Sequence, residues 1–430
     1  MASVTLSKLV GLSLVAAFVL TSLIAQPGAA DEGTQVSDGY LPDEVVVKLV
    51  PGASVAEVAV DYGLDSTPID QFGSRPIYRL RITDGATPPE RSEELVKDPN
   101  GRVMYAEPNY VGQTPEGRQQ SSWSRVDDGD FSGLADQWAV DKIRLQQAHA
   151  LTQGAGVTVA VLDTGVDATH PALVGHLIKG YDFVDMDLDP SEEGAAGKSL
   201  SYGHGTHVAG LVALAAPEAS IMPVRVLDSD GIGNVWVLAE ALSYAANPDG
   251  DPATDDGADV INLSLSTTRK TSLLDEIVGS VACEYEEDGG ETTGDCLGTA
   301  QAGAVVVAAA GNSASSTPEY PAAEGVKSLL SVAATTSADG LADFSNYGSW
   351  VNVAAPGEQI TSAVPGGEYA TWSGTSMAAP LTAGEVALVR SAYPGLSSVE
   401  TVDRVLASAA NIGGPEPFRI DAAAAVGARE

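Results

Sequence analysis

The apolar positions from about Ala135 onward follow two alternating patterns. Four near-continuous apolar runs have the length of strands: GVTVAVLD (156–163), ADVINLSLS (258–266), AVVVAAAGN (304–312) and KSLLSVAAT (327–335). Four other segments have helical spacing: 204–216, 234–246, 376–393 and 397–410. Strands this apolar are typical of a parallel sheet whose two faces are both covered by helices. We therefore predict an α/β fold for residues 135–430, a mostly parallel, twisted sheet with helices on both faces.

A different pattern precedes this region. Within residues 31–112, EVVVKLVPG reads as a strand and turn, SVAEVAVDYGL as a short amphipathic helix, PIYRLRI as an alternating strand and RVMYAEPNYV as a closing strand. This pattern predicts a small, separate α+β domain. Residues 113–134 are rich in Gln, Ser, Asp, Gly and Arg with few apolar positions, so we expect an exposed linker that proteases reach easily.

The first 30 residues resemble an export signal. Lys8 precedes an apolar run from Leu9 to Ile24, and the small residues Gly28, Ala29 and Ala30 follow it. This is the order of a cleaved secretory signal peptide, and the run is short for a bilayer span. A retained membrane anchor is the alternative. We expect cleavage, a secreted extracellular protein and no membrane attachment after removal of the signal.

The charge balance excludes some partners. The chain has 22 Lys and Arg against 58 Asp and Glu, a formal net charge of −36, and 12 against 39 of these lie from Gly133 onward. Such a surface repels nucleic acid and anionic membranes, and self-repulsion favours solubility and a monomer. Salt would screen the repulsion, which is compatible with a saline habitat.

The two cysteines, Cys283 and Cys296, flank an acidic, Gly-rich stretch. In an exported protein they favour a disulfide that closes a surface loop, with two free thiols as the alternative. Neither cysteine has the surroundings of a nucleophile.

Three short motifs carry the candidate chemistry: VAVLDTGVD with Asp163, GHGTHVAG with His204 and GTSMAAP with Ser376. Asp163 ends an apolar strand, whereas His204 and Ser376 open helices, where free N–H groups favour negative charge. A serine hydroxyl becomes a nucleophile when an imidazole accepts its proton, and a carboxylate then orients and stabilises that imidazole. Asp163, His204 and Ser376 provide these three groups.

In this order, the motifs resemble those of the subtilisin-like serine proteases, over roughly residues 135–426. The resemblance implies an acyl-enzyme endopeptidase in which Asn312 of AAGN and the Ser376 N–H donate hydrogen bonds to the oxyanion. It also implies that protein and peptide substrates add as an antiparallel strand between two edges, formed by Gly231, Ile232 and Gly233 and by Ser264, Leu265 and Ser266. The domain at 31–112 resembles the family's inhibitory propeptide, which implies an intramolecular inhibitor removed by a cut between Gln113 and Ala135.

Two departures from the family pattern bear on specificity. Ser266 stands where the family usually has glycine, and we expect it to crowd the substrate or narrow the first specificity pocket. Glu319, just before Tyr320 and Pro321, stands near the base of that pocket, where a carboxylate would favour Lys or Arg. The alternative is that Glu319 points into solvent. If Glu319 favours basic residues, Arg118 and Arg125 are candidate cleavage sites.

The chemistry requires no cofactor, but one acidic run suggests structural calcium. Asp182, Asp185, Asp187 and Asp189 offer hard oxygen ligands, and similar loops in some family members bind calcium. Ala172 stands where the family often has an aspartate, so a solvated acidic loop is the alternative.

Together these observations predict a secreted, autoprocessed serine endopeptidase of broad specificity. Two alternatives remain: a processing protease selective for basic residues, and a catalytically silent binding domain of the same fold.

Overall fold

The computed structural model describes residues 39–118, 124–126, 134–251, 253–283, 286–288, 291–293, 296–297, 303–413 and 418–428. The expected signal peptide at 1–30 lies outside these residues. Among the described helices, none combines the length and the apolar character that crossing a bilayer requires.

The N-terminal domain is the α+β unit that the sequence predicts, with one more helix, α2, and one more short strand, β2. Its elements are β1 (Tyr40–Leu49), α1 (Val55–Asp61), β2 (Asp70–Gln71), β3 (Ile77–Arg81), α2 (Pro88–Val96) and β4 (Val103–Gln113). β1 lies between β3 and β4 and pairs antiparallel with both. The unpredicted helix α2 begins with a capping box, in which the Thr87 hydroxyl accepts from the Glu90 N–H and the Glu90 side chain accepts from the Thr87 N–H.

The C-terminal region is built on a seven-stranded sheet in the order β15-β14-β13-β10-β6-β8-β7, and all of its pairings are parallel. The strands are β6 (Thr158–Asp163), β7 (Tyr181–Asp182), β8 (Ser220–Arg225), β10 (Val260–Leu263), β13 (Val305–Ala309), β14 (Leu329–Thr335) and β15 (Val353–Pro356). All four predicted strands are confirmed. β8 escaped prediction because Pro223 and Arg225 interrupt its apolar run.

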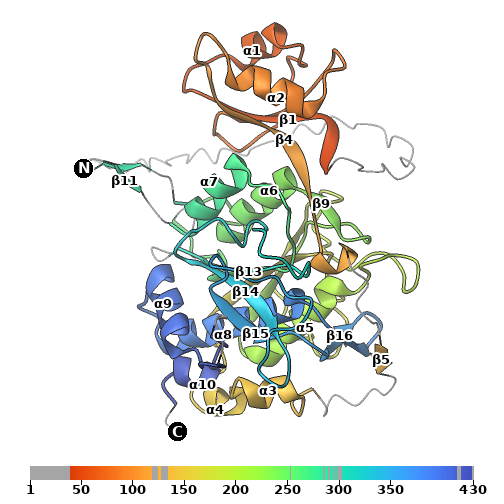
Figure 1. Ribbon diagram of the computed structural model, residues 1–430, viewed down its shortest axis with the longest axis vertical. Helices are drawn as coiled ribbons and strands as arrows, with labels where there is room; N and C mark the ends of the chain where they lie inside the picture. The colour runs from red at the N-terminus through yellow and green to blue at the C-terminus, as the bar shows by residue number, and fades with distance from the viewer. Residues whose placement is uncertain are drawn as a thin grey trace, which may run out of the picture. The chain divides into compact units, whose positions relative to one another are not determined.

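Helices cover both faces of this sheet (Figure 1). The helices of this region are α3 (Trp138–Lys142), α4 (Leu145–His149), α5 (His204–Ala215), α6 (Val235–Ala246), α7 (Ser272–Val281), α8 (Thr375–Ala392), α9 (Ser398–Ser408) and α10 (Ala422–Ala425). Along β6, Val159 and Val161 pack in the core with α5 and α8, while Ala160 and Leu162 pack in the core with α6 and α7. This alternation explains why the strands are apolar throughout.

In the described part of the chain, two small antiparallel sheets lie outside the two main sheets. β16 (Ile360–Val364) and β17 (Glu368–Trp372) form a hairpin, and β5 (Ser124–Val126) of the linker adds to β17 as a third antiparallel strand. β11 (Glu286–Asp288) pairs with β12 (Glu291–Thr293), and η1 is a 3₁₀ turn at Pro115–Arg118.

β4 continues beyond the N-terminal domain and pairs antiparallel with β9 (Ile232–Asn234) of the C-terminal region, as the long orange strand in Figure 1 shows. Gln113 also bridges to Ser266 on its other side. The expectation of an exposed linker from Gln113 onward is therefore wrong for its first residues. Thr114 and Pro115 are buried because their segment completes a ladder of backbone hydrogen bonds.

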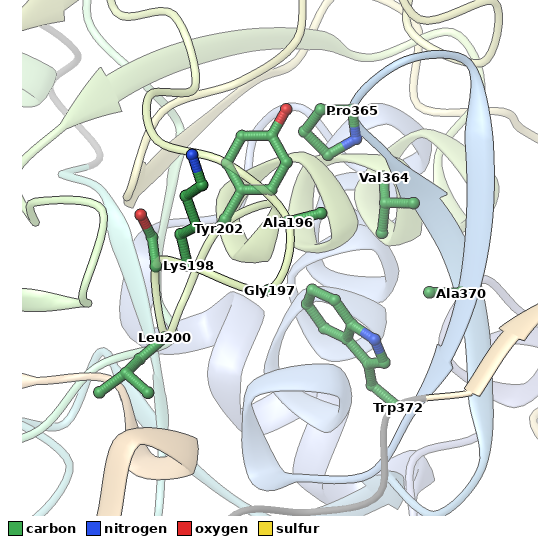
Figure 2. Close-up of a pocket in the computed structure, with 10 residues that line it drawn as sticks. Ala196, Gly197, Lys198, Leu200, Tyr202, Val364, Pro365, Ala370 and Trp372 are labelled. Carbon is green, nitrogen blue, oxygen red and sulfur yellow. The ribbon is translucent and has the colours of Figure 1, made fainter.

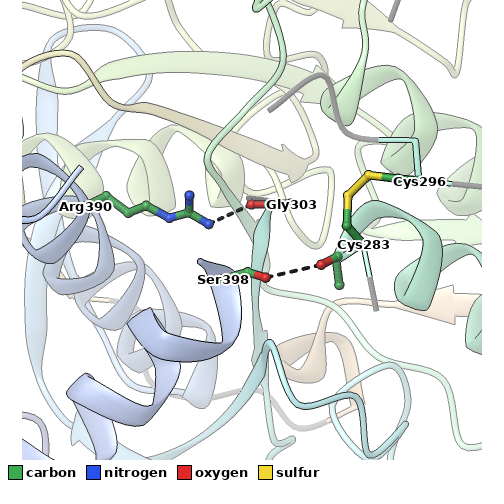
Figure 3. The surroundings of a disulfide bond; sticks show 6 residues. Cys283, Cys296, Gly303, Arg390 and Ser398 are labelled. Carbon is green, nitrogen blue, oxygen red and sulfur yellow. Dashed lines mark hydrogen bonds between the residues drawn. A yellow bond between two sulfur atoms is a disulfide. The ribbon is translucent and has the colours of Figure 1, made fainter. Parts of the chain in front are cut away.

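Cys283 and Cys296 form a disulfide with a Cα–Cα distance of 4.7 Å (Figure 3). It closes the loop that carries β11 and β12 at the end of α7. Beside it, Ser398 Oγ donates to the Ala282 carbonyl at 3.2 Å, and Arg390 Nη2 donates to the Gly303 carbonyl at 2.6 Å. These bonds tie the base of the loop to α8 and α9.

Candidate active site

Asp163 and His204 meet where β6 ends and α5 begins. His204 Nδ1 lies 2.6 Å from Asp163 Oδ1, and the Thr164 N–H donates to the same oxygen at 2.8 Å. Both side chains are buried. The approach depends on Gly205, because a Cβ there would lie 2.1 Å from the Gly165 carbonyl oxygen. The glycine of the GHGTH motif thus lets the first turn of α5 lie directly against the strand end.

Ser376 is the second residue of α8, and Asn312 follows the end of β13. The Thr375 N–H and the Thr375 hydroxyl each donate to Asn312 Oδ1 at 2.9 Å. Since the carbonyl end of the amide is held by Thr375, the Asn312 Nδ2 donor faces the site. The Thr375 hydroxyl itself accepts from the Gly311 N–H at 3.0 Å.

One carboxylate, that of Glu116 in η1, joins these groups. Ser376 Oγ donates to Glu116 Oε2 at 2.8 Å, and His204 Nε2 lies 3.1 Å from the same oxygen. Asn312 Nδ2 donates to the other oxygen, Oε1, at 2.9 Å. His204, Ser376 and Asn312 therefore converge on one position, which a side chain of the linker fills.

The charges of His204 and Glu116 stabilise each other. Burial alone would lower the pKa of His204, but Asp163 and Glu116 on its two nitrogens hold it well above the usual value. Burial would raise the pKa of Glu116, but its hydrogen bond and charge interaction with His204 and its bond from Ser376 lower it overall. The arrangement is an imidazolium between two carboxylates.

A further carboxylate, Glu192, lies behind Asp163 and His204. Its Oε1 accepts from the Thr164 hydroxyl at 2.7 Å, and its Oε2 accepts from the Thr206 N–H at 3.1 Å and the Thr206 hydroxyl at 2.9 Å. The N-cap residue of α5, Gly203, has no side chain that could accept a hydrogen bond from the first turn. Glu192 accepts that bond instead, from the Thr206 N–H. Burial, with the nearby Asp163 charge, raises the pKa of Glu192 to about 7 despite the hydrogen bond from Thr164.

The two expected substrate edges hold the end of β4 between them. Gln113 exchanges both backbone hydrogen bonds with Ser266, at 3.0 and 2.9 Å, and pairs with Ile232 on its other side. Gly112 pairs with Gly233, and the Thr114 N–H donates to the Gly231 carbonyl at 3.0 Å. Of the six expected edge residues, Ser264 also faces the site, because its carbonyl accepts from Ser376 Oγ at 3.4 Å, whereas Leu265 is buried in the core with α6 and α7.

Glu319 is buried at 4% exposure, so it does not point into solvent. Its Oε2 accepts from the Ser266 hydroxyl at 2.5 Å, and its Oε1 accepts from Asn346 Nδ2 at 3.0 Å and from the Ser313 hydroxyl at 3.2 Å. The Ser266 side chain thus bonds to Glu319, and its backbone still pairs with Gln113. Ser266 therefore does not crowd β4, and the other expectation, that it narrows the first specificity pocket, stays a prediction.

A cavity of about 680 Å³ lies beside Trp372 (Figure 2). Tyr202, Val364, Pro365 and Lys198 contribute to its lining. Trp372 also stacks on His207 at 4.5 Å between ring centroids. His207 is fully buried, which lowers its pKa to about 3, and it packs as expected without entering the catalytic centre.

In the acidic run at 182–189, two of the four expected calcium ligands bond to an arginine. Arg225 Nη1 bonds to Asp182 at 2.7 Å and to Asp185 at 2.6 Å. Asp187 and Asp189 accept from nearby N–H and hydroxyl groups of their own loop. Within the described ranges, no three or more His, Cys, Asp or Glu side chains are grouped so as to hold a metal ion. The guanidinium of Arg225 on β8 therefore balances the charge of Asp182 and Asp185, and structural calcium at this loop stays a prediction.

Sequence reasoning missed Glu116, Glu192 and Thr375. Thr375 is adjacent to Ser376 and carries a recognisable signal, a hydroxyl next to the nucleophile. Glu116 and Glu192 have none, because their roles depend on the path of a linker and of a loop.

Comparisons with known proteins find relatives of both parts of the chain. A family model described as the subtilase family matches residues 154–423, and one described as the fervidolysin N-terminal prodomain matches residues 27–109. A thermophilic serine proteinase of Bacillus sp. (strain AK1) is 38% identical over 391 residues, which cover 87% of this chain and 84% of that protein. Thermitase of Thermoactinomyces vulgaris is 38% identical over 273 residues, 61% of this chain and 85% of thermitase.

Among solved structures, fervidolysin from Fervidobacterium pennivorans, described as a keratinolytic enzyme related to subtilisin, superimposes with a TM-score of 0.71. The match covers 92% of this chain and 62% of that chain at 23% identity. At this identity the likeness concerns the fold, and it extends over both domains.

Proposed function

The chain belongs to the subtilase family of serine proteases and carries a prodomain, and we propose that it is a secreted, self-processed endopeptidase whose triad is Asp163, His204 and Ser376. The observation that carries this proposal is the convergence of His204 Nε2, Ser376 Oγ and Asn312 Nδ2 on one carboxylate at the end of an added strand.

The proposed chemistry starts when a substrate carbonyl takes the position that Glu116 now fills. Ser376 Oγ attacks the carbonyl carbon and its proton passes to His204 Nε2, while Asp163 stabilises the imidazolium through Nδ1. Asn312 Nδ2 and the Ser376 N–H donate to the oxyanion. Collapse of the intermediate breaks the peptide bond as His204 protonates the leaving amine, and water then hydrolyses the acyl-enzyme by the same relay.

Substrate recognition is proposed to follow the path of β4. A substrate would pair with Ile232 and Ser266 through its backbone, as Gln113 does, so affinity would depend little on its side chains. This mode supports broad specificity. The cavity beside Trp372 adjoins β17, along which the linker continues as β5, and would receive residues of the leaving group.

One observation favours the narrower alternative, a preference for Lys or Arg. Glu319 is a buried carboxylate beside Ser266 and Gly311, at the floor of this edge. Its hydrogen bonds from Ser266, Ser313 and Asn346 already stabilise its charge, which weakens the case. Cleavage of matched Arg, Leu and Phe substrates decides: equal or faster rates on Leu and Phe exclude the basic preference.

Labelling with an organophosphonate tests the proposed nucleophile. The secreted, processed protein should take up one equivalent at Ser376, and Ser376→Ala protein, processed in trans by the active enzyme, should take up none. A catalytically silent binding domain would leave Ser376 unmodified. N-terminal sequencing of the same secreted protein tests export and locates the processing bond.

A further inference from the structure

The three hydrogen bonds to Glu116 come from the three side chains that the proposed reaction uses. Ser376 Oγ and His204 Nε2 both bond to Oε2, at 2.8 and 3.1 Å, and Asn312 Nδ2 bonds to Oε1 at 2.9 Å. Glu116 Oε1 also lies where a Cβ on Gly374 would be only 1.9 Å away. The carboxylate is therefore enclosed, with 14% of its side chain exposed.

The backbone before Glu116 explains how this side chain reaches the centre. The ladder with Ser266 and Gly231 holds Gln113 and Thr114 as an extended strand. Pro115 has no N–H with which to continue the ladder, and η1 begins there. The turn brings a side-chain carboxylate, in place of a main-chain carbonyl, to the Asn312 donor.

We propose that the catalytic centre is a carboxylate-binding site and that Glu116 is its intramolecular ligand, the group by which the linker inhibits the enzyme. This inference rests on the proposed function, and it identifies the chemical group, a side-chain carboxylate, that inhibits the proposed protease before processing. The ligand class is an extended peptide that carries a side-chain carboxylate three residues after the residue paired with Ser266. The same peptide should bind the processed enzyme in trans.

Inhibition follows from the contacts in two ways. The Ser376 hydroxyl donates its hydrogen bond to Glu116 and not to His204, and the Asn312 Nδ2 bonded to Glu116 is no longer free for an oxyanion. In addition, an imidazolium held between Asp163 and Glu116 has no lone pair with which to accept a proton from Ser376.

The inhibited state has a defined pH window. Glu116 is charged above its lowered pKa, and His204 is charged below its raised pKa, so the ion pair exists between the two. The other titratable groups around the pair are Asp163 on the far side of the imidazole, Glu192 behind it, and the buried, neutral His207. As the pH rises through the pKa of His204, the imidazole loses its charge and the site releases the carboxylate. Self-processing should therefore accelerate on the alkaline side.

Peptides in trans test the ligand directly. The probe is residues 110–117 (Tyr-Val-Gly-Gln-Thr-Pro-Glu-Gly), acetylated and amidated so that Glu116 supplies its only carboxylate. Against the processed enzyme near pH 7, the inhibition constant should be roughly tenfold to a hundredfold lower than for the same peptide with Glu116→Gln, because charged hydrogen bonds are lost. The ratio should shrink as the pH rises. Equal inhibition by the two peptides would overturn the proposal.

The full chain gives an independent readout. Glu116→Gln should speed self-processing near pH 7, whereas Glu93→Gln, at an exposed residue of α2, should leave its rate unchanged. In the Ser376→Ala proenzyme, which cannot process itself, NMR titration of His204 should give a lower pKa with Glu116→Gln than without it. An unchanged His204 titration would contradict the contact. A different outcome would separate the two proposals. If the His204 pKa is higher with Glu116 than with Glu116→Gln, but the processed wild-type protein hydrolyses no substrate, the proposed function is disproved and the carboxylate site is retained.

Discussion

At the scale of single residues, the site depends on side chains that orient the reacting groups. Asn312 presents its Nδ2 because Thr375 holds its Oδ1 with two hydrogen bonds, and Thr375 is itself fixed by the Gly311 N–H. An amide without these bonds would have to become ordered before its Nδ2 could donate to an oxyanion, which costs free energy. Thr375 thus positions Asn312, the proposed oxyanion donor.

We expect Thr375→Val to lower kcat by roughly tenfold with little change in KM, because the hydroxyl is lost while the backbone N–H still holds Asn312 Oδ1. Asn312→Ala should lower kcat by about 10²- to 10³-fold, which is the loss known for the oxyanion-hole asparagine of subtilisin. Steady-state kinetics of the processed enzymes measure both, with Thr375→Ser as the control that restores the hydroxyl. Activity of Thr375→Val equal to that of the wild type would exclude the positioning role.

At the scale of elements, the proposed catalytic groups lie at two junctions between strands and helices: one where β6 meets α5, and one where β13 meets α8. The apolar runs predicted these strands because each strand is buried on both faces. The motifs identified Asp163, His204, Ser376 and Asn312 as candidates because each motif is local in sequence, and the structure brings the four side chains together. Glu192 was not predictable, since a loop brings it to the N-terminus of α5. The ion pairs of Asp182 and Asp185 with Arg225 were unpredictable for the same reason, because Arg225 lies on another strand, β8. The calcium expectation for this loop stays a prediction.

Glu192 predicts a pH dependence of folding stability. Its pKa in the folded protein, about 7, is above the usual value for glutamate, so the folded state favours the protonated form. For an acid shifted upward, the contribution to the free energy of unfolding is largest at low pH and declines as the pH rises from about 4.5 to 7. Urea unfolding of the Ser376→Ala proenzyme should show this decline.

The control for this titration is Glu192→Gln, which keeps the size and polarity of the side chain. Its addition to the Ser376→Ala proenzyme should reduce the decline between about pH 4.5 and 7. The same slope in both proteins would show that Glu192 does not titrate there.

At the scale of the whole molecule, β4 joins the two domains by one continuous strand, and its end lies between the two proposed substrate edges. The sequence predicted the prodomain and the protease separately. The sequence did not predict that β4 continues into the protease domain, because Gln113, Thr114 and Glu116 are polar. Polar residues outside a periodic pattern are typical of a solvent-exposed linker. The burial of these three residues comes from backbone pairing and from the charge of His204, neither of which depends on apolar side chains.

The net charge of −36 predicts a salt-dependent stability. Added NaCl shortens the range of repulsion among the acidic side chains and should raise the unfolding midpoint of the Ser376→Ala proenzyme by several degrees between about 0.1 and 1 M. Differential scanning calorimetry measures the shift, with an uncharged osmolyte at equal osmolality as the control. A midpoint that falls with NaCl would mean that attractive ion pairs, such as those of Arg225, outweigh the repulsion.

The central claim is that Asp163, His204 and Ser376 form one proton relay once Glu116 has left. The most direct measurement is a crystal structure of the processed enzyme without inhibitor. We predict that His204 Nε2 then lies within hydrogen-bond distance, about 3 Å, of Ser376 Oγ, while Nδ1 keeps its bond to Asp163. An imidazole that stays apart from the Ser376 hydroxyl in the processed, active protein would contradict the account.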